Sequence, residues 1–137
     1  MNAPKPMTLL IYSDDRTTRE RVRLALGRRP AADVPEVEFV ECATWPAALE
    51  ALDAGDIDLA IMDGESAPYG GLGLAKQIKD EIYQAPPVLV LIGRPQDAWL
   101  ATWSRAEAAV SHPIDPIVLA EAVADLMRRI AARAPAS

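Results

Sequence analysis

Five short apolar runs, each followed by a segment with helical spacing, restrict the fold of this sequence more than any other feature. The runs cover residues 7–14, 37–43, 57–63, 86–93 and 107–111. Most are nearly uninterrupted stretches of Leu, Ile, Val, Met and Ala, which is typical of strands buried on both faces of a sheet. Strands that alternate with helices require a parallel sheet covered on both faces. We therefore expect an α/β fold, a doubly wound five-stranded parallel sheet with the flavodoxin-like order 2-1-3-4-5.

The segments between the runs carry signals for helix starts and stops. Thr17 and Glu20 have the spacing of a capping box, and Gly27 is expected to end the helix that they open. Pro46 is expected to begin a second helix, which Gly55 closes. Further helices are expected around Leu74, Ile78 and Ile82, over residues 96–106, and from about Asp115 to Arg133.

Length and composition predict one soluble domain over residues 1–137, with a core from about 7 to 131 and short disordered tails. The net charge of −6 and the absence of a clustered positive face argue against direct nucleic-acid binding. The single cysteine, Cys42, excludes an internal disulfide and suits a reducing cytoplasm. The N-terminal apolar run is too short for a membrane span, so we expect a cytoplasmic protein without membrane insertion.

Three acidic residues follow two strands that are neighbours in the predicted order. Asp14 and Asp15 come directly after the first strand, and Asp63 ends the third. Because the carboxyl ends of parallel strands share one edge of the sheet, these carboxylates are expected to lie close together. Such a group requires either a raised pKa or a divalent cation. Oxygen ligands favour Mg²⁺, so we predict a magnesium site there.

Three sequence segments together resemble the receiver domain of two-component response regulators. They are "IYSDD", "IMDGE" and "VSHP", and the resemblance extends over roughly residues 7–131. It implies that Asp63 accepts a phosphoryl group from a histidine kinase. It also implies that Asp14, Asp15 and Asp63 hold Mg²⁺, with the backbone carbonyl of Glu65 as a further ligand. A receiver is a signalling protein, so we do not expect an enzyme.

Three positions depart from the receiver pattern. Ile92 stands where receivers have Ser or Thr, Ala109 where they have an aromatic switch residue, and His112 where they have lysine before a proline. A hydrogen bond to a charged group contributes about 1.5–3 kcal/mol, so Ile92 forfeits about that much stabilisation of a phosphorylated form. His112, the only histidine, can alternatively be a packing or turn residue. The resemblance also implies a cis bond between His112 and Pro113.

Two other features have competing interpretations. The segment "GGLGLAK" at 70–76 lacks the spacing of a P-loop or a dinucleotide fingerprint, which favours an ordinary loop and helix start. Trp99 and Trp103 lie four residues apart on the expected fourth helix, either in the core or as exposed binding anchors. The resemblance places the partner surface on the face formed by helix 4, strand 5 and helix 5, so we favour an interface.

The sequence therefore predicts an atypical single-domain receiver that acts as a protein–protein interaction and signalling module. Its partner is expected to be a histidine kinase or a larger complex. One alternative is a phosphorelay intermediate phosphorylated on Asp63. Another is a constitutive, non-signalling subunit of a larger assembly. A flavin or small-ligand binder is disfavoured, because no glycine-rich phosphate loop follows the first strand.

Overall fold

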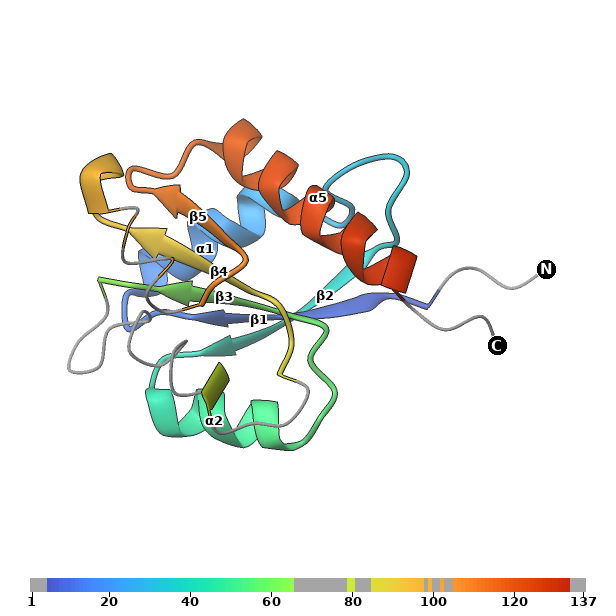
Figure 1. Ribbon diagram of the computed structural model, residues 1–137, viewed down its shortest axis with the longest axis horizontal. Helices are drawn as coiled ribbons and strands as arrows, with labels where there is room; N and C mark the ends of the chain where they lie inside the picture. Colours follow the sequence, from blue (N-terminus) through green and yellow to red (C-terminus); the bar gives the residue numbers. More distant parts are fainter. Residues whose placement is uncertain are drawn as a thin grey trace.

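All five expected strands are present in the computed structural model, which describes residues 5–65, 79–80, 85–97, 99, 102 and 105–133 (Figure 1). The strands are β1 Met7–Tyr12, β2 Val37–Cys42, β3 Leu59–Asp63, β4 Val88–Ile92 and β5 Ala108–Ser111. They form one parallel sheet in the order β2-β1-β3-β4-β5. The fold class and the strand order are therefore confirmed.

Alternate residues of each central strand enter two separate cores. Leu9, Ile11 and Ile61 belong to the core beneath α1 (Arg16–Leu26) and α5 (Pro116–Arg133). Leu10, Met62 and their alternating neighbours belong to the core beneath α2 (Trp45–Asp53). Figure 1 shows α1 and α5 on one side of the sheet and α2 on the other. Burial on both faces explains why these strands are continuously apolar in sequence.

The helices differ from the sequence prediction in two places, the start of α1 and the helix expected over residues 96–106. Helix α1 is capped by Asp15 and begins at Arg16, so the capping box at Thr17 and Glu20 is wrong. Asp15 takes that place because its carboxylate accepts the Thr17 amide, one of the donors that the first turn leaves unpaired. Gly27 ends the helix at φ +59°, as expected, and its amide donates to the carbonyl of Arg23.

The other described helices begin and end close to the expected residues. Thr44 caps α2, with Pro46 in the first turn and Gly55 just beyond its end at φ +83°. Asp115 accepts the amides of Ile117 and Val118 at the start of α5. Residues Pro95–Asp97 form a short 3-10 turn, labelled η1, and Arg105 has φ +64°, so both ends of the helix expected over residues 96–106 are wrong. Most of the residues between them lie outside the described part of the chain. The segment 70–76, most of the helix expected around Leu74, Ile78 and Ile82, and Trp103 lie outside the described residues.

Candidate functional site

The buried carboxylate of Asp63 is the centre of the polar edge formed by the carboxyl ends of β1, β3 and β5. Asp63 is only 3% exposed. Its Oδ2 accepts a hydrogen bond of 2.7 Å from the hydroxyl of Ser13, at the end of β1. Its Oδ1 accepts the backbone N–H of Glu65 at 3.0 Å and lies 3.2 Å from Nε2 of His112. The parallel sheet thus brings together three groups that are about fifty residues apart along the chain.

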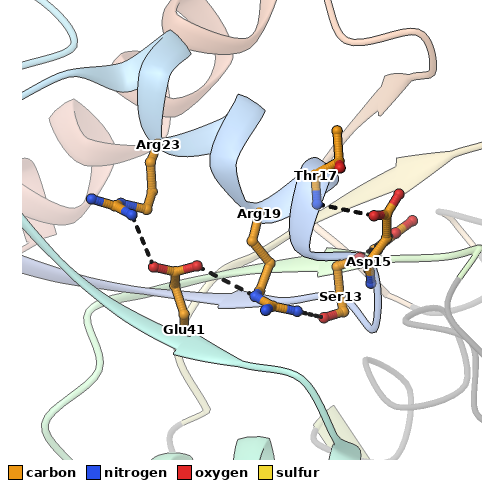
Figure 2. Close-up of polar contacts among 7 residues, drawn as sticks. Ser13, Asp15, Thr17, Arg19, Arg23 and Glu41 are labelled. Carbon is orange, nitrogen blue, oxygen red and sulfur yellow. Dashed lines mark hydrogen bonds and ion pairs between the residues drawn. The ribbon is translucent and has the colours of Figure 1, made fainter.

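The carboxylate of Asp15, the second acid after β1, is held at the start of α1. The carboxylate of Asp15 accepts the Thr17 amide at 2.9 Å (Figure 2). It also accepts the Thr18 hydroxyl at 3.1 Å. These hydrogen bonds lower the pKa of Asp15, because they favour its charged form. Among the residues that the structure describes, no three acidic, His or Cys side chains are placed to hold a metal ion. The expected meeting of three carboxylates is therefore not seen, because the start of α1 takes up Asp15.

Asp14 and Asp63 lie near the same buried ring, that of Tyr12. Burial raises the pKa of Tyr12, and the negative charges of Asp14 and Asp63 raise it further. Two carboxylates and a backbone carbonyl are donors that suit Mg²⁺, which needs only one or two carboxylates and retains several waters. The donor chemistry of Asp14, Asp63 and the Glu65 carbonyl therefore fits Mg²⁺. Binding of the ion, and a part for Asp15 in it, stay predictions.

The three positions that the sequence predicts to be altered switch positions have distinct surroundings. Ile92 is 3% exposed and packs in the same core as Tyr12 and Met62. Ala109 is exposed on β5. His112 is partly buried, its amide donates to the carbonyl of Ile92 at 2.8 Å, and its bond to Pro113 is cis, as expected. Because Nε2 of its imidazole lies beside the Asp63 carboxylate, His112 is not only a packing or turn residue.

Gly93, after β4, lies directly beneath the carboxylate of Glu65. A Cβ atom at Gly93 would collide with Oε1 of Glu65. Arg94 is next in sequence, and its guanidinium contacts the carboxylate of Asp97. This contact raises the pKa of the guanidinium, and the charge of Glu65 raises it further. The side chain of Glu65 therefore extends from the end of β3 to the end of β4.

Exposed apolar side chains are found in two regions. Trp99 is 65% exposed, which excludes a core position for it, whereas Trp103 lies outside the described residues. On α1 and α5, Leu24, Ile117 and Val118 are 77%, 70% and 50% exposed, and the sequence prediction did not single them out.

Ser13 and the arginines that support its loop were missed by the sequence prediction. Figure 2 shows Arg19 between Ser13 and Glu41, with Arg23 on the other side of Glu41. A hydroxyl directly before an acid pair at a strand end was the available signal. Its partner, however, lies fifty residues away in sequence, so the sequence alone did not reveal the contact.

Comparisons with known proteins agree with this geometry. The chain is 57% identical over 122 residues to an uncharacterized response regulatory protein of Mycobacterium tuberculosis, found in strains CDC 1551 and H37Rv. The matched region covers 89% of this chain and 92% of that protein. No protein-family model matches the chain.

Solved receiver structures share the fold at lower identity. The chemotaxis response regulator CheY4 of Vibrio cholerae is 19% identical with a TM-score of 0.74, covering 89% of this chain and 99% of that one. The BeF3-activated receiver domain of DrrB, a Thermotoga maritima protein, is 17% identical with a TM-score of 0.71, covering 91% and 100%. The described helices include none long and apolar enough to cross a membrane. By its close relative and its fold, the chain belongs to the response regulators and has the receiver fold.

Proposed function

We propose that this chain is an atypical receiver that acts as a protein–protein interaction and signalling module, with Asp63 as its phosphoacceptor. The observation that carries the proposal is the position of Asp63. Its carboxylate is buried at the carboxyl edge of the sheet, with Oδ2 held by Ser13 and Oδ1 beside His112. A carboxylate held in one orientation is a suitable nucleophile for phosphoryl transfer, which depends on positioning and charge stabilisation.

In the proposed reaction, a carboxylate oxygen of Asp63 attacks the phosphorus of a phosphohistidine on the kinase. The new O–P bond forms as the P–N bond breaks. The electron pair of the P–N bond returns to the kinase imidazole. The Glu65 amide and the Ser13 hydroxyl orient the nucleophile. Mg²⁺, when held by Asp14, Asp63 and the Glu65 carbonyl, would offset the negative charge of the phosphoryl oxygens.

The altered positions make the proposed receiver atypical. Ile92 has no hydroxyl to bind a phosphoryl group, and its side chain is packed in the core beneath α2. Ala109 has no aromatic ring that could move between buried and exposed positions. A phosphorelay intermediate is the second candidate, because it requires the positioned carboxylate of Asp63 but not a conformational output. The hydrogen-bonded Asp63 favours both candidates over a constitutive subunit, which would have no use for a positioned carboxylate.

Phosphoryl incorporation tests the role of Asp63. The purified chain would be treated with acetyl phosphate and Mg²⁺ and its intact mass measured. We expect the mass of one phosphoryl group in the unmodified chain and none in Asp63→Asn. Asp33→Asn is the matched control, because Asp33 is an exposed aspartate paired with Arg128, and it should be labelled normally. An unmodified chain that gains no phosphoryl group would overturn the proposed acceptor.

The partner is proposed to dock on the face formed by the segment around Trp99, β5 and α5. Trp99 offers a large exposed aromatic surface, and exposed Trp side chains are common anchors of protein interfaces. After native purification and identification of the co-purifying chain, affinity would be measured for Trp99→Ala and for Leu24→Ala, an equally exposed apolar residue on α1. We expect a loss of about 2 kcal/mol or more for Trp99→Ala only. The reverse pattern would place the partner on α1.

A further inference from the structure

Ser13 is completely buried between the end of β1 and the start of α1, and its polar atoms bind groups of four residues. Its amide donates to the carbonyl of Cys42 at 3.2 Å. Its carbonyl accepts the guanidinium of Arg19 at 2.7 Å. Its hydroxyl accepts the amide of Asp15 at 3.1 Å and donates to Oδ2 of Asp63 at 2.7 Å. A residue fixed at each polar atom has little freedom to move.

The hydroxyl of Ser13 makes the two oxygens of Asp63 different. Oδ2 is held from the β1 side, whereas Oδ1 is held by the Glu65 amide and lies beside His112, from the β5 side. A hydroxyl that donates to a buried carboxylate at this distance forms a charge-assisted hydrogen bond, which is stronger than a neutral one. The bond therefore fixes the rotation of the carboxylate group.

Arg19 supports Ser13 from the surface. Its guanidinium joins the Ser13 carbonyl to Glu41 on β2, and Glu41 also contacts Arg23 (Figure 2). The side chain of Arg19 is 15% exposed, so its contact with the carbonyl is partly shielded from water. Arg19 therefore helps to hold Ser13 in place, and Ser13 in turn holds the carboxylate of Asp63.

We propose that Ser13 is a positioning residue for phosphoryl transfer: its hydroxyl holds Oδ2 of Asp63 and thereby fixes the rotation of the carboxylate that attacks phosphorus. This inference rests on the proposed role of Asp63 as phosphoacceptor. With acetyl phosphate as donor, a bond from a carboxylate oxygen of Asp63 to phosphorus forms and the bond from phosphorus to the acetate oxygen breaks. The electron pair leaves with acetate, and Ser13 keeps its proton throughout.

The test compares the initial rate of phosphoryl incorporation in the unmodified chain, Ser13→Ala and Thr44→Ala over a range of acetyl phosphate concentrations. Thr44 is the matched control, because it follows the neighbouring strand β2 and its hydroxyl accepts the amide of Ala47 at the start of α2. We expect the maximal rate of Ser13→Ala to fall about tenfold or more, the equivalent of one charged hydrogen bond. The half-saturating concentration should not change, because the hydroxyl touches Asp63 and not the donor.

A second measurement does not depend on turnover. Trifluoroberyllate binding, followed by ¹⁹F NMR with Mg²⁺, should give well-resolved bound resonances in the unmodified chain and in Thr44→Ala, and weakened or broadened ones in Ser13→Ala. Thermal unfolding confirms that each variant is folded. If Ser13→Ala does not fold, Ser13→Cys takes its place, because a thiol is a similar size but a weak donor.

The outcomes separate this inference from the proposed function. A folded Ser13→Ala or Ser13→Cys with the unmodified maximal rate and unmodified ¹⁹F resonances would overturn the positioning role alone. A rise in the half-saturating concentration with an unchanged maximal rate would also contradict it, because Ser13 would then act on donor binding. If the unmodified chain takes up neither phosphoryl group nor trifluoroberyllate and matches Asp63→Asn, the proposed function fails first.

Discussion

At the residue scale, neighbouring side chains of the same type have different roles in this molecule. Asp14 acts electrostatically on Tyr12, whereas Asp15, the next residue, caps α1. The difference follows from the backbone: Asp15 has the extended conformation of an N-cap, with φ −98° and ψ 111°, and its carboxylate reaches the free amides of the first turn. The identity of the side chain alone does not decide between these roles.

The cap predicts how stability depends on pH. Hydrogen bonds lower the pKa of Asp15 in the folded chain, so its charged form contributes stability above the ordinary aspartate pKa of about 3.9. This contribution is lost as the pH falls through the lower folded pKa. We expect Asp15→Asn, which retains a capping side chain, to match the unmodified chain at pH 7 and to lose less stability below about pH 4.

Thermal unfolding with EDTA, followed by circular dichroism at a series of pH values, measures this difference. EDTA removes any contribution from a bound cation. Parallel melting-temperature curves for the two proteins down to low pH would contradict the assigned role of the Asp15 charge.

At the element scale, α5 shows how an amphipathic helix divides its side chains between core and surface. Leu119, Val123 and Met127 are completely buried against the sheet and α1. Ile117, two residues before Leu119, is 70% exposed. The spacing of three to four residues on the buried side is the basis on which the sequence predicted this helix.

Truncation of one buried and one exposed side chain of α5 tests that division. Leu119→Ala should lower the free energy of unfolding by about 2–5 kcal/mol, because it removes buried surface and leaves a cavity. Ile117→Ala, the matched control on the same helix, should change it by less than about 0.5 kcal/mol. Urea unfolding curves give both values. A large loss for Ile117→Ala would mean that its side chain is covered in solution.

At the scale of the whole molecule, β4 lies between β3, which carries Asp63, and β5, which carries the exposed Ala109. Ile92 at the end of β4 is fixed in the core, and Ala109 on β5 is a small exposed residue. Ile92 has no hydroxyl that could bind a phosphoryl group at the end of β4, and Ala109 has no aromatic ring that could change position on β5. We therefore expect phosphorylation to change the structure around Asp63 but not that of β5.

Chemical-shift changes in ¹H–¹⁵N spectra measure that response. With trifluoroberyllate and Mg²⁺, we expect large changes for amides around Ser13, Asp63 and Glu65 and small ones for Ala108–Val110. The CheY4 protein, treated in the same way, is a comparison chain of the same fold. Changes at Ala108–Val110 as large as those around Asp63 would contradict the predicted loss of the switch.

The pattern of apolar runs along the chain was enough to predict the architecture and the edge of the sheet where Asp63 and His112 meet. The continuous apolar strands require burial on both faces of a sheet, and the parallel order then places Asp14, Asp63 and His112 at one edge. Both conclusions depend only on the periodicity and order of elements, which are local properties that can be counted along the chain.

Only the tertiary structure decided which polar groups at that edge touch one another. The bond from Ser13 to Asp63 joins β1 to β3, and the contact of His112 with Asp63 joins β5 to β3. Each of these two contacts depends on a distance of about 3 Å between segments far apart in the sequence, and hydrogen bonds weaken steeply beyond that range. The order of elements along a sequence determines which strands are neighbours, but not the orientation of a side chain to that precision.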